Sequence, residues 1–240
     1  SIPHPMTLYG IDAHSGGQLV PAVDPPGGLA LFYYHADEAS PNVKPGLMLR
    51  RFDTTTWKPF NEVFVEQQGD YGFAIAPGPV VAQKNADGIG YAVTWRGPVE
   101  NDGGYITATW IRLIDAQGSP AGGSVEIDPP SAYPGTGATV AWSGASFIVA
   151  SNSRACPGDD AACANRLTVS SLSKLGLTKT AAAAPNAGMR ARTPLLRSYG
   201  GQTWAAWREQ LITAKPENDP PSIVRLAAID PSGQLSPIVW

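Results

Sequence analysis

The sequence has few charged residues: Asp, Glu, Lys and Arg make up 15% of its 240 residues, against about 25% in an average globular chain. Its 17 basic and 20 acidic side chains give a net charge of −3 and a pI near 5.6. This balance indicates no basic surface for nucleic acid or for an anionic membrane. We therefore expect no nucleic-acid partner.

Long apolar runs and helical patterns are also lacking. No stretch approaches the roughly 20 apolar residues that cross a bilayer, so we expect no membrane insertion. The longest helix-like run, 180–184, ends at Pro185, while Gly and Pro are abundant at 26 and 23 residues. Proline interrupts helices and glycine favours turns, so the composition predicts an all-β chain. Because the chain starts at Ser1, we also expect a processed or trimmed product.

The chain has only two cysteines, Cys156 and Cys163, in one short loop that contains Pro157 and Gly158. We predict a local disulfide, which would stabilise the fold by about 2 to 3 kcal/mol in the chain-entropy model. Disulfides persist in oxidising compartments, which predicts a secreted, periplasmic or cell-surface protein. The alternative is a pair of free thiols in a cytosolic protein.

Four segments of the chain share one layout. A short apolar strand precedes a strand led by glycine, and a polar loop, a third strand and a turn follow. The third strand and turn end in Asp-x-x-Gly twice, at 115–118 and 230–233. The segments recur at intervals of roughly 50 to 60 residues, which is typical of propeller blades. The strands led by glycine lie at 28–34, 90–95, 144–150 and 201–207.

This layout resembles that of secreted bacterial repeat β-propellers, whose blades carry a Gly-aromatic-apolar-Val-x-Trp strand, here 90–95, followed by a strand ending in Asp-x-x-Gly. The resemblance implies an all-β fold, a β-propeller of about four blades with four antiparallel strands each, and it implies no activity. A β-sandwich or part of a larger propeller are the alternatives. We expect one domain over 1–240. Its repeats are predicted at about 19–73, 74–133, 134–189 and 190–240, with a partial N-terminal strand unit at 5–17.

Motifs for catalysis and cofactors are mostly missing. The sequence has no phosphate-binding loop and no Gly-x-Ser-x-Gly. The sialidase Asp-box is half matched at 201–204, but Arg197 and Tyr199 stand in place of its Ser and Asp. We predict no metal and no cofactor, with calcium at 85–88 as the alternative, because such short acidic stretches supply too few oxygens.

Tryptophans recur inside alternating strand patterns. We predict that Trp95, Trp110, Trp204 and Trp207 are core residues. Trp95-Arg96 and Trp207-Arg208 occupy equivalent positions in two repeats. The alternative interpretation of these pairs is a site in which the indole stacks on a ligand and the guanidinium binds it.

The polar loops predict the working surface. Connections alternate between the two ends of an antiparallel sheet, so loops 35–45, 96–104, 151–165 and 208–221 should lie on one face. We expect an extracellular, non-catalytic recognition or scaffold module that binds a polar ligand, a polysaccharide or a partner protein there. The alternatives are a carbohydrate-binding (lectin-like) propeller, a secreted glycoside hydrolase or lyase, and a subunit of a surface assembly or oligomer. The candidate ligand-binding residues are His35, Asp37, Arg96, Glu100, Asp102, Asp159, Asp160, Arg208, Glu217 and Asp219.

Overall fold

The computed structural model describes residues 20–23, 28–35, 46–67, 76–82, 89–101, 104–131, 138–154, 165–212 and 221–237. These residues form strands and turns, and no helix occurs among them. The strands are β1 (Val20–Val23), β2 (Leu29–His35), β3 (Gly46–Phe52), β4 (Pro59–Gln67), β5 (Ala76–Ala82), β6 (Ile89–Asn101), β7 (Gly104–Asp115), β8 (Val125–Ser131), β9 (Ala138–Trp142), β10 (Phe147–Arg154), β11 (Asn165–Ser173), β12 (Gly176–Ala183), β13 (Met189–Tyr199), β14 (Gln202–Leu211) and β15 (Ser222–Ile229). 

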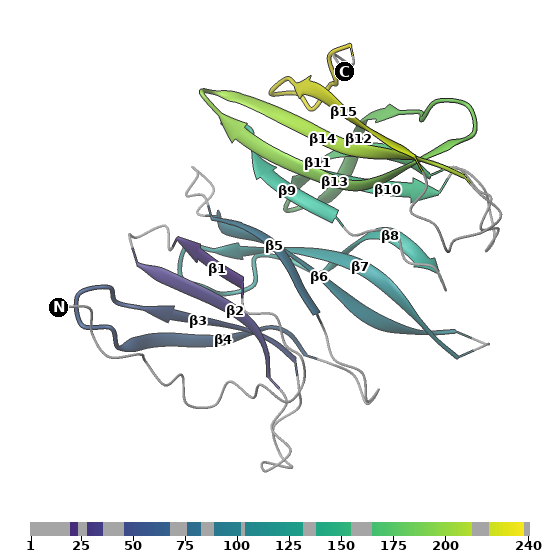
Figure 1. Cartoon of the computed structure of the whole chain (residues 1–240). Helices are drawn as coiled ribbons and strands as arrows, with labels where there is room; N and C mark the ends of the chain where they lie inside the picture. The colour runs from purple at the N-terminus through teal and green to yellow at the C-terminus, as the bar shows by residue number, and fades with distance from the viewer. Residues whose placement is uncertain are drawn as a thin grey trace.

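The strands form four antiparallel sheets in sequence order, which we call blades 1 to 4 (Figure 1). Blade 1 is β1-β2-β3-β4, blade 2 is β5-β6-β7-β8, and blade 3 is β9 to β12. Blade 4 has β13, β14 and β15 in the described part of the chain, where the sequence predicts four strands. The prediction of an all-β fold with about four blades is confirmed.

The predicted loop at 96–104 is wrong. In the structure β6 continues through Arg96 to Asn101 and pairs with β7 along its whole length, so that only 102–103 connect the two strands. Gly97 and Pro98 suggest a loop, yet Pro98 pairs with Thr107 in the ladder. Beyond Arg96, β6 has β7 as its one neighbour in the described sheet. Proline is tolerated at such an edge because its missing N–H is not needed there.

Each pair of neighbouring blades shares an apolar core. Phe32 and Leu49 of blade 1 pack with Tyr91 and Trp95 of blade 2. Ala92, Ile111 and Leu113 of blade 2 pack with Val140, Phe147 and Val149 of blade 3. Ile148, Leu167 and Val169 of blade 3 pack with Leu196, Trp207 and Ile229 of blade 4. A fully buried side chain of this size contributes about 1.5 to 3 kcal/mol, so these three interfaces hold the blades together.

Successive residues of a strand point to opposite faces of its sheet. We call the face that blades 1 to 3 turn toward the next blade the forward face, and the opposite one the rear face. In β6 the forward face carries Ala92, Thr94 and Arg96, and the rear face carries Val93 and Trp95.

Polar contacts reinforce the interfaces at their margins. Arg112 of blade 2 donates to the Val65 carbonyl of blade 1 at 2.5 Å and pairs with Glu66 at 3.2 Å. Ser198 of blade 4 donates to the Trp142 carbonyl of blade 3 at 2.5 Å. Because backbone carbonyls accept these bonds, they fix the relative position of neighbouring blades.

The described residues include no helix that is long and apolar enough to cross a membrane.

Candidate functional site

The two ends of the blades differ in how their strands are joined. Since neighbouring strands are antiparallel, the connections between second and third strands all leave from one end, which we call the loop face. These connections are 36–45, 102–103, 155–164 and 212–221. The opposite end, the turn face, carries the connections between third and fourth strands and between first and second strands.

Tight turns on the turn face are closed by their own side chains. Asp53 accepts the amide hydrogens of Thr55 and Thr56 at 2.7 and 2.8 Å. Asp230 accepts those of Ser232 and Gln234, both at 2.9 Å. Asp115 and Ser143 cap their turns in the same way. These polar groups are therefore already bound within the chain.

Hydrogen bonds to these turn carboxylates change their acidity. The backbone N–H of Thr56, followed by that of Thr55, lowers the pKa of Asp53. The Ser232 hydroxyl and then the Gln234 amide lower the pKa of Asp230. Both carboxylates are thus held ionised as structural acceptors.

Three of the described glutamates are held in ion pairs, namely Glu62, Glu66 and Glu209. Glu62 binds Arg50 at 2.5 Å and accepts a hydrogen bond from the Tyr33 hydroxyl. Glu66 pairs with Arg112 across the interface of blades 1 and 2. Glu126 is on the surface, and partial burial raises its pKa. The described residues contain no group of three or more His, Cys, Asp or Glu side chains that could hold a metal ion.

A layer of polar side chains replaces the apolar core where two of the interfaces approach the loop face. Between blades 2 and 3, Arg96 lies on the forward face of β6, and buried Ser151 lies on the rear face of β10. Between blades 3 and 4, Asn152 lies on the forward face of β10 and is 2% exposed. We call Arg96, Ser151, Asn152, Glu209 and Arg225 the polar layer.

Glu209 is the most deeply buried charged group of this layer. It is 1% exposed on the rear face of β14, and its Oε2 lies 3.3 Å from Nε of Arg225. The same oxygen accepts the Asn186 amide hydrogen at 3.3 Å. A carboxylate is buried at so little exposure only when it is paired. Trp207 stands two residues earlier on the same face, and its Nε1 is buried without an acceptor in the described structure.

Sequence reasoning missed Glu209, Asn152 and Arg225. The signal that could have found Glu209 is strand alternation, because residues 205, 207 and 209 share one face of β14 and Trp207 is predicted to be buried. The position of Arg225 becomes visible only in the strand pairing, where it stands opposite Trp207 on β15.

The predicted site residues are only partly described. Arg96 is half-buried between blades 2 and 3, while Arg208 lies on the forward face of blade 4, so the structure does not bring these two together. His35 is the last residue of β2 and Glu100 is the last but one of β6, so the backbone of both lies at the loop face. The predicted calcium loop at 85–88 and the N-terminal unit at 5–17 lie outside the described residues. So do the remaining site candidates and the two cysteines of the predicted disulfide, which are Asp37, Asp102, Asp159, Asp160, Glu217, Asp219, Cys156 and Cys163.

The tryptophan predictions have mixed outcomes. Trp95 and Trp207 are each 2% exposed within the interblade cores, as predicted. Trp110 packs against the core between blades 1 and 2. The prediction for Trp204 is wrong, because this side chain is 37% exposed on the forward face of blade 4.

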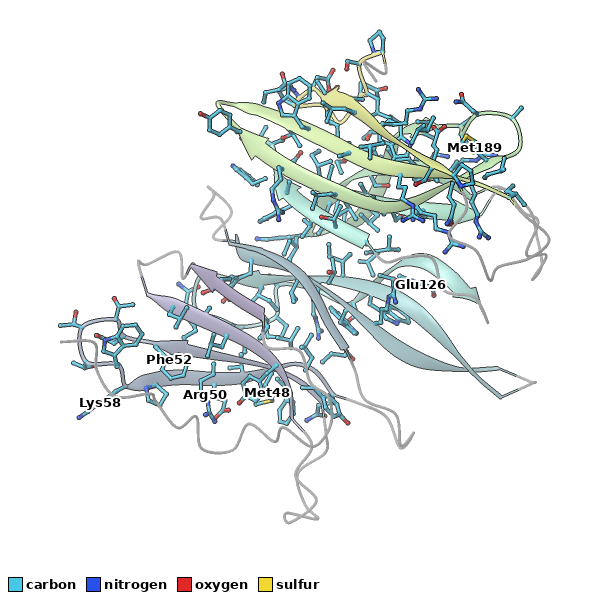
Figure 2. The ribbon with its side chains drawn as sticks, in the orientation of Figure 1. Met48, Arg50, Phe52, Lys58, Glu126 and Met189 are labelled. Atoms are coloured by element: carbon cyan, nitrogen blue, oxygen red, sulfur yellow. The ribbon has the colours of Figure 1, made fainter. Side chains whose placement is uncertain are left out.

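That face also carries an arginine cluster, Arg190, Arg192 and Arg208. Arg192 stands opposite Arg208, and Arg190 lies two residues earlier on β13. Burial, followed by the charges of Arg190 and Arg208, lowers the pKa of Arg192. Figure 2 shows nitrogen-tipped side chains gathered near Met189 at this end of blade 4.

No protein-family model matches the chain, and no curated protein matches its sequence. Among solved structures, it is similar to an N-acetylgalactosamine deacetylase from F. plautii in complex with blood group B trisaccharide, with a TM-score of 0.41, 12% identity, and coverage of 88% of this chain and 70% of that one. It is also similar to a glycoside hydrolase family 43 arabinoxylan arabinofuranohydrolase from Bacillus subtilis in complex with cellotetraose, with a TM-score of 0.44, 11% identity, and coverage of 93% and 49%. A third similarity is to a GH32 beta-fructofuranosidase from Bombyx mori in complex with sucrose, with a TM-score of 0.37, 12% identity, and coverage of 95% and 52%.

The chain therefore spans about half the length of the last two proteins. Similarities of this size carry no conclusion about its reaction or ligand. What its own sheets define is an all-β protein of the propeller class, with about four blades stacked through apolar interfaces.

Proposed function

We propose that this protein is an extracellular, non-catalytic recognition module that binds a polysaccharide at its loop face. The observation that carries the proposal is the difference between its two ends. The described turns of the turn face at 53–58, 115–119 and 230–234 are tight, and their polar groups are satisfied by Asp53, Asp115 and Asp230. The loop face carries three long connections and the extended hairpin of β6 and β7.

A compact fold needs only about two to five residues for a hairpin connection. Lengthening several of them at the same end serves no packing purpose. Loops held by a rigid scaffold are where binding residues concentrate. The loop face is therefore the side on which a ligand is expected.

The polar layer gives the loop face a polar floor. Ser151, Asn152 and Glu209 are 4%, 2% and 1% exposed, so they support the loops from below and do not themselves contact a ligand. A sugar, whose hydroxyls donate and accept hydrogen bonds, suits a face built on such a layer. These side chains also replace apolar packing with hydrogen-bonding groups directly below the loops.

Polysaccharide affinity electrophoresis tests the proposal. Neutral and acidic polysaccharides are embedded in native gels, and the mobility of the full chain is compared with that of variants in which 36–45, 155–164 or 213–220 is replaced by a short Gly-containing turn. We expect retardation by at least one polysaccharide, and its loss in one or more variants that keep the wild-type melting temperature. Trp57→Ala, on the turn face, is the matched control and should leave retardation unchanged.

Retardation that survives all three loop replacements would place the binding surface elsewhere, and no retardation by any polysaccharide would reject the ligand class. Release of reducing sugars from a retarding polysaccharide would replace the binding module by the alternative, a glycoside hydrolase. That chemistry needs two carboxyl groups about 5 to 9.5 Å apart. Of the described carboxylates, Asp53, Asp115 and Asp230 cap turns on the opposite end, Glu62, Glu66 and Glu209 are ion-paired, and Glu126 is exposed on β8 with a raised pKa.

Export is the second part of the proposal, and it depends on the disulfide predicted between Cys156 and Cys163. Mass spectrometry of a non-reduced digest checks it. We expect one peptide pair linked through these cysteines, whereas two free thiols in protein isolated from its source would contradict export.

A further inference from the structure

The forward face of blade 4 is exposed, whereas the other three forward faces are covered by the next blade. In blade 2, Ala92 and Thr94 lie on this face and are 0% and 1% exposed. The equivalent positions of β14 hold Trp204 and Ala206, counted back from Trp207, and Trp204 is 37% exposed. The same type of sheet face is thus an interior surface in one blade and an outer surface in another (Figure 1).

Apolar side chains form a continuous patch on this face. The ladder places Leu195 beside Ala206 and Leu226, and it places Trp204 beside Ala228. Leu195 is 45% exposed and Val224, further along β15, is 67% exposed. We call Leu195, Trp204, Ala206, Val224 and Leu226 the blade 4 patch. Large exposed apolar patches on soluble proteins mark interaction sites.

The charge of this face has one sign. Arg190, Arg192 and Arg197 lie on it along β13, and Arg208 lies on it in β14. None of the positions that the described strands β13, β14 and β15 direct to this face is acidic. The Nε atoms of Arg190 and Arg192 are buried without an acceptor in the described structure. Mutual repulsion contributes to the lowered pKa of Arg192, so a facing carboxylate would be favourable there.

The residue types also point to a protein partner. Protein interfaces are enriched in Trp, Tyr and Arg and poor in Lys, Glu and Asp at their centres. This face combines Trp204 and exposed Tyr199 with four arginines. Each of the other three forward faces packs against a sheet of the next blade, so a sheet is the kind of surface that this type of face accommodates.

A second copy of the chain is a poor match. Its own forward face of blade 4 would bring further arginines and no described carboxylate. On its rear face of blade 1, Leu31 and Tyr33 are 4% and 1% exposed, and the carboxylate there, Glu62, is already paired with Arg50. A different protein that carries carboxylates beside apolar side chains fits the charge and the apolar residues of this face better than a second copy does.

We propose that the forward face of blade 4 binds a β-sheet face of another protein, with carboxylates opposite Arg192 and Arg197 and apolar side chains opposite the blade 4 patch. This interaction is independent of polysaccharide binding at the loop face, and either can fail without the other.

Site-specific photocrosslinking tests the proposal on the full chain. The photoreactive residue p-benzoylphenylalanine is placed at 204, and at 57 as the control, since Trp57 is similarly exposed at 42% but lies on the turn face. Both proteins are irradiated with the secreted and cell-surface proteins of the source cells. A protein labelled from 204 and not from 57 is then purified, and its binding to the unlabelled full chain is measured.

The expected result has three parts. Trp204→Ala and the double variant Arg192→Glu/Arg197→Glu each weaken binding of that purified protein at least about tenfold, whereas Trp57→Ala leaves it unchanged. Circular dichroism confirms that the variants are folded. Reversing an acidic residue of the partner to Lys restores binding to the double variant, which only a direct charge contact explains.

Three outcomes would overturn the proposal. The first is that no protein is labelled from 204 beyond those labelled from 57, or that the labelled protein binds every variant equally. The second is a wild-type dimer in sedimentation velocity that dissociates in Trp204→Ala, which would make a second copy the occupant. The third is displacement of the labelled protein by polygalacturonate with retention of that polymer lost in Trp204→Ala, which would make an acidic polysaccharide the occupant.

Discussion

Blades 2 and 4 contain the same Trp-Arg pair but use the neighbouring positions differently. Trp95 and Trp207 both project to the rear and are both 2% exposed. The forward faces differ, since Ala92 is enclosed by blade 3 and Trp204 is on the surface. The residues on the rear face are therefore packed in both blades, whereas the burial of the residues on the forward face depends on whether another sheet covers them. A repeated sequence pattern thus fixes one face of a strand more firmly than the other.

The largest effect that separates the two faces is expected at Trp207. Trp207→Ala should lower the free energy of unfolding by about 3 to 5 kcal/mol, because it removes a fully buried indole from the core between blades 3 and 4. Urea unfolding followed by circular dichroism measures this. Trp204→Ala, three residues away on the opposite face, is the matched control and should change stability by less than about 1 kcal/mol. Equal losses in the two variants would show that the forward face of blade 4 is covered in solution.

Removing Glu209 should have the next largest effect. Glu209→Ala leaves the Arg225 charge in a largely buried position and should cost about 3 kcal/mol. The double variant Glu209→Ala/Arg225→Ala should lose less than the sum of the two single variants, because the second change removes the group that the first one orphaned. Chemical denaturation of all four proteins measures this coupling. Strict additivity would show that the pair contributes nothing.

A smaller effect is expected from enlarging equivalent alanine positions. Ala92→Leu adds volume to the closed interface of blades 2 and 3 and should cost about 1 to 3 kcal/mol. Ala206→Leu adds the same volume to the open forward face of blade 4 and should change stability by about 0.5 kcal/mol or less. Thermal unfolding of both variants provides the comparison. A loss at Ala206 as large as that at Ala92 would mean that both faces are packed.

The smallest effect on stability is expected at the Asp230 turn of blade 4, and it depends on pH. Hydrogen bonds hold the pKa of Asp230 below its ordinary value of 3.8. The folded state therefore binds this proton less readily than the unfolded chain does. The stabilisation is present above 3.8 and is lost as the pH falls through the folded pKa. Asp230→Asn should accordingly flatten the acid limb of the stability curve in urea unfolding across that range. An unchanged acid limb would show that the carboxylate is not held in solution.

Several features could be predicted from the sequence because they depend on local chemistry. Strand alternation and turn residues are local, so β6, β9 and β14 could be predicted, and so could the burial of Trp95 and Trp207. The Asp-x-x-Gly turns at 115–118 and 230–233 follow from the ability of aspartate to accept hydrogen bonds from the next amides. The prediction at 96–104 fails because glycine and proline mark both loops and edge strands, and sequence does not show which strands have a second neighbour.

What the sequence alone determined about this protein is its class: an all-β chain of repeated antiparallel sheets, each with one dependable packing face. Only the tertiary structure decided which second faces are covered. Trp204 fits a core pattern as well as Trp207 does, and the difference between them is the presence of a neighbouring sheet. The ion pair of Glu209 and Arg225 likewise joins two strands through their register. Burial on a given face depends on contacts between residues far apart in the chain, and periodicity within one strand carries no information about them.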